Sequence, residues 1–152
     1  YAAREDSKGP KARFFMKSLR DWAAWSGLPL NFPAPWHPVR SVHAMRACCA
    51  LEDDQPALAS FAEAAFAAYF DRKENIDEPE VLAALANDLA MDGAALVAQT
   101  QDDAVKLRLR TNTEEVIERG GFGSPSIFVN GSDMYFGNDQ LPLVRRAITS
   151  AI

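Results

Sequence analysis

The chain has 152 residues, of which 48% are hydrophobic and 24% are charged, so it can bury a core and is not a disordered chain. Its formal net charge of −5 disfavours binding to nucleic acid or to an anionic membrane surface. It contains neither an apolar run near the roughly 18–20 residues of a membrane span nor a signal-like leader, so we expect a cytoplasmic protein without nucleic-acid or membrane partners.

The first part of the chain predicts helices on either side of a proline-rich segment. Hydrophobic residues recur at helical spacing over residues 14–25, and Gly27 is a typical residue to end that helix. Four prolines between residues 28 and 38 indicate an extended, irregular connection. Two further helices are predicted over residues 39–51 and 56–70.

Acidic residues predict where the next helices begin. Asp77 is expected to cap a helix that reaches residue 90, because Pro79 and an acidic first turn follow it. Asp92 is expected to cap a short helix that ends at Thr100. A longer helix is predicted over residues 102–118.

The periodicity changes after residue 118. Residues 126–130 and 133–136 are rich in β-branched and aromatic side chains around an Asn-Gly pair, which predicts two strands joined by a turn. Asn138 or Asp139 is expected to cap a last amphipathic helix. A hairpin with one helix is marginal in water, so we expect it to pair with strands outside this β-β-α segment.

The cysteines and histidines do not indicate a redox or a metal site. Cys48 and Cys49 are adjacent, and neighbouring helical side chains diverge by about 100°, so we interpret them as reduced core residues rather than as a reactive pair. His37 and His43 have no cysteine or acidic cluster beside them in the sequence. No metal ligands are therefore predicted.

The most informative segment is the glycine-rich loop that ends in Ser124-Pro125 just before the first predicted strand. A proline in this position suits a cis peptide bond, because an X-Pro bond favours trans by only about 0.5–1 kcal/mol. The backbone before the proline could then face a peptide-like ligand. The alternative interpretation is an ordinary proline between a loop and a strand.

Five segments in order carry a resemblance to known families. They are Lys11-Ala-Arg-Phe-Phe-Met with Gly27-Leu-Pro-Leu-Asn-Phe-Pro33, Ala44-Met-Arg-Ala, Asp77-Glu-Pro-Glu-Val-Leu, Gly121-Phe-Gly-Ser-Pro125 and Phe136-Gly-Asn-Asp139. Together they resemble the kappa-class glutathione transferases and the 2-hydroxychromene-2-carboxylate isomerases of the DsbA-like group. The implied fold class is α/β and thioredoxin-like, with a large inserted all-helical domain. Residues 1–118 would be that helical insertion with its leading linker, and residues 119–152 the C-terminal β-β-α half.

The resemblance implies a glutathione-dependent isomerase that acts on an unsaturated aromatic carboxylate, with a kappa-like glutathione transferase as the alternative. It also implies a homodimer. The implied glutathione-binding residues are Lys11, Ser124, Pro125, Phe136, Gly137, Asn138 and Asp139, and Trp36 would face the substrate. In this family the serine that activates the thiol belongs to an N-terminal strand-helix-strand unit. That unit has no match in this sequence, so we assign no catalytic residue.

Each implied role has a simpler alternative. Asp139 would bind the γ-glutamyl ammonium and Asn138 the adjacent carboxylate, or both would merely cap the helix. Ser124 would offer its backbone to the cysteinyl unit of glutathione. Lys11 would contact the glycyl carboxylate, or would be a solvated surface charge. Trp36 would lie against a flat substrate, or would pack on the helical domain or on a partner subunit.

Two other functions stay open at this point. A DsbA-like thiol-disulfide oxidoreductase would need a Cys-X-X-Cys pair, which this sequence does not contain. A non-catalytic helical interaction domain would need another protein to cover the apolar strand edge.

Overall fold

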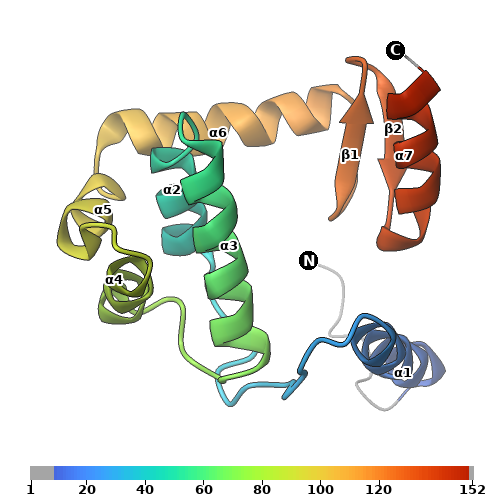
Figure 1. Cartoon of the computed structure of the whole chain (residues 1–152), viewed down its shortest axis with the longest axis horizontal. Coiled ribbons are helices and arrows are strands. Elements are labelled where there is room, and N and C mark those ends of the chain that lie inside the picture. Colours follow the sequence, from blue (N-terminus) through green and yellow to red (C-terminus); the bar gives the residue numbers. More distant parts are fainter. Residues whose placement is uncertain (1–8, 151–152) are drawn as a thin grey trace. The chain divides into compact units, whose positions relative to one another are not determined.

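The computed structural model describes residues 9–150 and divides the chain into two compact units, Tyr1–Gln101 and Asp102–Ile152 (Figure 1). The first unit contains the helices α1 (Pro10–Trp25), α2 (Val42–Ala50), α3 (Gln55–Phe70), α4 (Pro79–Asp88) and α5 (Gly93–Gln99). The second contains α6 (Asp103–Glu118), β1 (Ser126–Val129), β2 (Asp133–Phe136), the short 3-10 helix η1 (Asn138–Gln140) and α7 (Leu141–Ser150). No helix in residues 9–150 is both long and apolar enough to cross a membrane.

The compact units do not divide at the predicted domain boundary. Helix α6 belongs with the hairpin in the contact pattern, whereas the sequence placed residues 1–118 in one domain and 119–152 in the other. Compact units need not coincide with the domains of a fold, so the predicted division stays a prediction.

Helix α1 ends at Trp25, just before Gly27, as predicted. Gly27 has a φ of +67°, in the left-handed region that favours glycine. The Leu28 N–H donates to the Ala23 carbonyl at 2.9 Å, and the Gly27 N–H donates to the Ala24 carbonyl at 3.2 Å. These two bonds form a Schellman motif, which satisfies carbonyls that the helix end would otherwise leave without donors.

Two helix starts in the first unit are capped by aspartate side chains. Asp54 accepts a hydrogen bond from the Ala57 N–H at 3.1 Å, and Asp92 accepts one from the Ala95 N–H at 2.9 Å. The predicted cap at Asp92 is therefore confirmed. Each bond satisfies one of the N–H groups that the first turn of a helix leaves without a partner.

The predicted cap at Asp77 is wrong. The residue at the N-cap of α4 is Glu78, whose side chain makes no capping bond. The Asp77 carboxylate lies instead 3.7 Å from Arg40 Nε and 3.6 Å from His43 Nδ1. The Asp77 side chain thus lies toward Arg40 and His43 rather than at the first turn of α4, its Oδ1 accepts no hydrogen bond from the described residues, and the helix begins at Pro79.

Helix α2 also begins later than predicted. The sequence indicated a start at residue 39, but Ser41 is the N-cap and Val42 is the first helical residue. Val39 nevertheless packs against the core from the extended connection. The apolar side chain that suggested a helix is therefore half-buried without being helical, and hydrophobic spacing cannot distinguish the two cases.

The core of the first unit lies where α2, α3, α4 and α5 meet. Its most buried side chains include Phe61 of α3 and Leu82 and Ala86 of α4. Helix α5 approaches α4 so closely that a Cβ at Gly93 would lie 2.1 Å from the Ala83 carbonyl oxygen. The two helices can therefore pack this closely only because residue 93 has no side chain.

The second unit is built on an antiparallel hairpin. Ser126 lies opposite Phe136 and Val129 opposite Asp133, which confirms the two predicted strands. Helix α7 packs against β1, and Val129 and Val144 are buried. The Arg119 side chain, just after α6, lies over the Phe128 ring at 4.0 Å and donates to the Gly131 carbonyl. Arg119 therefore ties the end of α6 to both the strand and its turn.

Truncation of two phenylalanines of α3 should change the free energy of unfolding by very different amounts. Phe61→Ala should lower the free energy of unfolding by about 3–5 kcal/mol, because it leaves a cavity at a fully buried site. Phe66→Ala changes the same residue type at a position that is 65% exposed, so we expect a change within about 0.5 kcal/mol. Urea unfolding followed by circular dichroism measures both. Similar losses in the two variants would contradict this description of the core.

Candidate functional site

Six of the predicted site residues lie near the open end of the hairpin, where β1 begins and β2 ends. They are Ser124, Pro125, Phe136, Gly137, Asn138 and Asp139. The Gly137 N–H donates to the Pro125 carbonyl at 3.1 Å, one position beyond the Ser126–Phe136 pair. This bond continues the antiparallel ladder by one rung. It places Ser124 and Pro125 beside the segment from Phe136 to Asp139.

Ser124 offers an unpaired backbone at this position. Its peptide bond to Pro125 is cis, as the sequence predicted. In the described part of the chain, neither the N–H nor the carbonyl of Ser124 is hydrogen-bonded to another residue. The residue is exposed. Because backbone polar groups are strong hydrogen-bonding groups, this pair is suited to an extended peptide-like ligand.

Gly137 turns the chain out of the strand. Its φ of +102° and ψ of 155° lie in a region that is essentially reserved for glycine. A Cβ here would also lie 2.5 Å from Asp139 Oδ1. The Asp139 carboxylate can therefore occupy its position next to the end of β2 only because residue 137 has no side chain.

The predicted cap at Asn138 or Asp139 is wrong. Gly137 is the N-cap of η1, and no side-chain hydrogen bond caps this turn. Both residues enter the 3-10 turn themselves, because the conformation of Gly137 redirects the chain one residue earlier. Helix α7 then continues from Leu141.

The Asp139 carboxylate is exposed and lacks a cationic partner. It accepts a hydrogen bond from Gln140 Nε2 at 3.2 Å, and it forms no ion pair with any residue between 9 and 150. The Asn138 side chain is exposed beside it. An anionic group and an amide thus follow Gly137, whose N–H is bonded to Pro125, and an ammonium group is the natural partner for the carboxylate.

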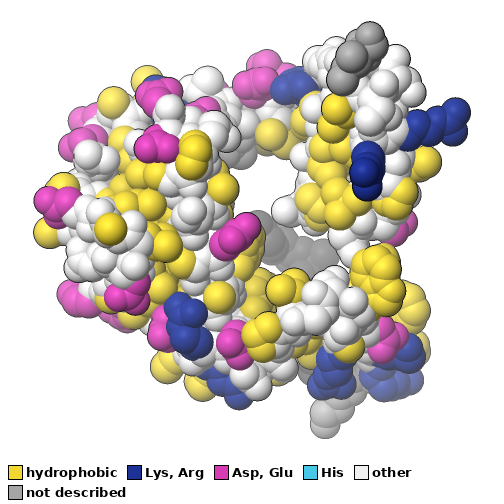
Figure 2. Space-filling model, in the orientation of Figure 1, with side chains coloured by type: hydrophobic (Ala, Val, Ile, Leu, Met, Phe, Trp, Pro, Cys, Tyr) yellow, Lys and Arg dark blue, Asp and Glu magenta, His cyan; other side chains and the backbone are white. Residues whose placement is uncertain are grey.

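The structure adds a residue that the sequence analysis did not single out. Phe122 lies in the loop before Ser124, and its ring centroid is 4.5 Å from that of Phe136. Figure 2 shows hydrophobic side chains gathered on the visible face of the second unit. An aromatic residue inside a glycine-rich loop was the available signal, since such a loop has few neighbours to bury it.

The other two predicted residues belong to the first unit. Lys11 lies in the first turn of α1. The Trp36 Nε1–H donates to the Lys73 carbonyl at 3.0 Å, while 45% of the residue stays exposed. This bond holds Trp36 to the helical unit and leaves part of its ring free. The roles of both residues toward glutathione and substrate stay predictions.

The cysteines pack against the core of the first unit, and His37 makes a contact within that unit. Cys49 is buried, and Cys48 is half-buried against the core. Burial raises the pKa of the Cys48 thiol, and the neighbouring Cys49 raises it further. His37 Nδ1 lies within hydrogen-bond distance of the Tyr69 hydroxyl. In residues 9–150, no group of three or more His, Cys, Asp or Glu side chains could hold a metal ion.

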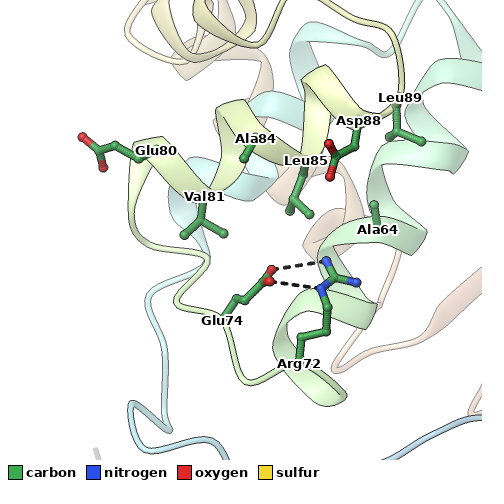
Figure 3. Close-up of a pocket in the computed structure, with 9 residues that line it drawn as sticks. All are labelled: Ala64, Arg72, Glu74, Glu80, Val81, Ala84, Leu85, Asp88 and Leu89. Carbon is green, nitrogen blue, oxygen red and sulfur yellow. Dashed lines mark hydrogen bonds and ion pairs between the residues drawn. The ribbon is translucent and has the colours of Figure 1, made fainter.

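A separate groove of about 500 Å³ lies between α3 and α4 (Figure 3). The side chains of Ala64, Val81 and Leu85 are among its apolar lining. At its edge the Arg72 guanidinium donates to both carboxylate oxygens of Glu74, at 3.1 and 3.2 Å. The groove contains none of the predicted site residues.

The sequence of residues 2–149 matches the family model of the DSBA-like thioredoxin domain. The chain belongs to the DsbA-like thioredoxin domain family. The predicted fold class is therefore confirmed, and in residues 9–150 it takes a mostly helical form with a two-stranded antiparallel sheet.

Individual relatives are named as isomerases. The chain is 30% identical over 138 residues to 2-hydroxychromene-2-carboxylate isomerase of Sphingobium xenophagum, a match that spans 87% of this chain and 65% of the relative. It is 27% identical to the enzyme of the same name from Pseudomonas putida, over 91% of this chain and 66% of the relative. The chain thus spans just under two thirds of the length of these curated relatives.

A solved structure agrees with this family. The selenomethionine form of a 2-hydroxychromene-2-carboxylate isomerase superimposes with a TM-score of 0.79 at 26% sequence identity. The superposition spans 93% of this chain and 67% of the other chain.

Replacing Gly137 should disturb the site as well as the backbone. Gly137→Ala should cost about 1–3 kcal/mol of stability and displace the Asp139 carboxylate, because the new Cβ meets it. Gly131→Ala is the control, since its φ is +91° but a Cβ there would contact nothing within 4 Å. Both should destabilise the hairpin, whereas only Gly137→Ala should shift the amide NMR signals of residues 138–140. Equal shifts in both variants would contradict this geometry.

The Cys48 thiol should react slowly in the folded protein. Its raised pKa means that thiolate forms at higher pH in the folded than in the unfolded state, and packing limits access to the sulfur. In a Cys49→Ser variant, labelling by a disulfide reagent at pH 8 should be at least several-fold slower without urea than with it. Equal rates in the two conditions would show that Cys48 is not a core residue.

Proposed function

We propose that this protein is a glutathione-dependent isomerase of the 2-hydroxychromene-2-carboxylate isomerase type. The proposal rests chiefly on two groups near the open end of the hairpin, the Ser124 backbone and the Asp139 carboxylate, which have no backbone partner and no cationic partner, respectively, among residues 9–150. Its second support is the similarity to relatives of that name. A peptide with an ammonium group at one end and a free thiol fits such an arrangement.

The residues of the second unit match the groups of glutathione in turn. The Ser124 backbone would pair with the cysteinyl unit, in the manner of an added strand. The Asp139 carboxylate would bind the γ-glutamyl ammonium. Asn138 and the N–H groups at the start of the terminal helical segment would hold the γ-glutamyl carboxylate. Phe136 and Gly137 would line the pocket, and the missing side chain at Gly137 leaves room for the bound peptide.

In this proposal, two residues of the first unit keep the roles that the resemblance implies. Lys11 would contact the glycyl carboxylate, and the exposed part of Trp36 would lie against a flat substrate. Glutathione, when bound, would supply a thiolate that adds reversibly to an unsaturated carbon of an aromatic carboxylate substrate and is then released. The task of the protein is to orient the peptide and to favour the thiolate over the thiol.

A kappa-like glutathione transferase would use the same binding residues and differ in its substrate. Conjugation of chlorodinitrobenzene without isomerase activity would favour that alternative. A thiol-disulfide oxidoreductase would need a Cys-X-X-Cys pair in the N-terminal unit of the family, since Cys48 and Cys49 are adjacent and packed in the helical unit. The homodimer and the cytoplasmic location stay predictions.

Removing the charge of Asp139 should weaken glutathione binding. In the intact protein, Asp139→Asn should raise the dissociation constant by about 10–100-fold, because a hydrogen bond to a charged group contributes about 1.5–3 kcal/mol. Isothermal titration calorimetry with glutathione measures this. Asp103→Asn is the control, since it removes an exposed carboxylate of the same unit outside the site.

A glutathione analogue separates this role from a structural one. Glutaryl-cysteinylglycine lacks the ammonium group, so its affinity should be similar for the wild type and for Asp139→Asn. Unchanged glutathione affinity in Asp139→Asn would exclude Asp139 from the site. The absence of glutathione binding by the intact wild type would overturn the proposed function.

A further inference from the structure

The Asp139 carboxylate has one hydrogen-bond donor among the described residues, and that donor is neutral. Gln140 Nε2 lies 3.2 Å from Asp139 Oδ2. No lysine, arginine or histidine of residues 9–150 forms an ion pair with this carboxylate. An ionised carboxylate has about four lone-pair positions on its two oxygens, so one amide donor leaves the others open. The negative charge of Asp139 therefore stays available to a ligand.

The two oxygens of this carboxylate are constrained by different neighbours. Oδ2 accepts the hydrogen bond from the Gln140 side chain. Oδ1 lies 2.5 Å from the position that a Cβ of Gly137 would take, so it approaches the backbone where a side chain is missing. Gly137 thus leaves room for the carboxylate, whereas Gln140 supplies the bond that holds its orientation.

The backbone turn keeps Gln140 in place beside its neighbour. The Gln140 N–H donates to the Gly137 carbonyl at 3.3 Å, within the same turn that carries Asp139. Gln140 is half-buried, whereas Asp139 is exposed. The donor is therefore anchored by the fold, and it orients the carboxylate before a ligand arrives. Fixing a side chain before binding removes an entropy cost from the binding step.

We propose that Gln140 is a positioning residue, which holds the Asp139 carboxylate in the orientation that binds the ammonium group of a peptide ligand. This inference rests on the proposed function, in which Asp139 binds the γ-glutamyl ammonium. A glutamine suits this role because its amide donates a hydrogen bond but carries no charge that would compete with the ammonium. Gln140 thus raises the affinity through Asp139 rather than by a contact of its own.

Gln140→Met tests this hydrogen bond, because methionine has a similar length but no donor. Isothermal titration calorimetry of the intact protein should give a glutathione dissociation constant about three- to tenfold higher than that of the wild type. Gln101→Met is the matched control. Gln101 Nε2 also donates to the residue before it, at 3.1 Å from Thr100 Oγ1, but it belongs to the first unit. This control should leave the dissociation constant unchanged.

Two further measurements separate positioning from a general effect on the fold. In the Asp139→Asn background, Gln140→Met should change the glutathione affinity by less than about 1.5-fold, because the charged group through which it acts is absent. Glutaryl-cysteinylglycine lacks the ammonium group, so its affinity should be the same for the wild type and for Gln140→Met. A structural role would instead lower the affinity for both ligands and in both backgrounds.

The outcomes distinguish this inference from the proposed function. If Asp139→Asn weakens glutathione binding and Gln140→Met does not, the positioning role is overturned and the glutathione site stands. Equal losses for glutathione and for the ammonium-free analogue would overturn the positioning role in the same way. If Asp139→Asn has no effect, the inference fails together with the role of Asp139. If the wild type does not bind glutathione, it fails together with the proposed function.

Discussion

The hydrogen bond from the Gly137 N–H to the Pro125 carbonyl is the contact on which the candidate site depends. It continues the hairpin ladder past its last strand pair and brings two separate stretches of sequence together. Register is strict in such a ladder, because a slip of one residue sends every side chain to the opposite face. The placement of Pro125 opposite Gly137 is therefore a consequence of strand pairing.

The site is built from backbone groups with few side chains. Ser124 contributes an N–H and a carbonyl, Gly137 contributes the absence of a side chain, and Asp139 contributes one carboxylate. Under the proposed function, such a site would recognise a peptide by its main chain and by the charge at one end. The Phe122 and Phe136 rings lie at the same end of the hairpin, with their centroids 4.5 Å apart.

The two compact units differ in how they are stabilised. The first has a core at the meeting of four helices, with Phe61 and Leu82 removed from water. In the described part of the second, Val129 and Val144 are the hydrophobic residues of comparable burial. There the Arg119 side chain, which contacts both Phe128 and Gly131, adds bonds that a small core does not supply. Two strands alone are marginal in water, so these tertiary contacts matter more in the second unit.

Local sequence was sufficient where short-range chemistry decides the structure. Gly27, Asp92 and the Asn-Gly turn predicted their elements correctly, because left-handed backbone, helix capping and hairpin turns involve residues a few positions apart. The position of Pro125 likewise suggested the cis peptide bond that the structure contains, while the role of that backbone toward a ligand stays a prediction. The resemblance between short segments was enough to predict the thioredoxin-like fold class, which the family match confirms.

Tertiary structure decided where distant residues compete for the same group. Asp77 was predicted to cap a helix, but its carboxylate lies 3.7 Å from Arg40 Nε and 3.6 Å from His43 Nδ1, two residues far away in the sequence. Phe122 escaped notice because its contact with Phe136 exists only once the hairpin has paired. A local pattern states which bonds a residue can make. Only the fold determines which of those partners is close enough to form the bond.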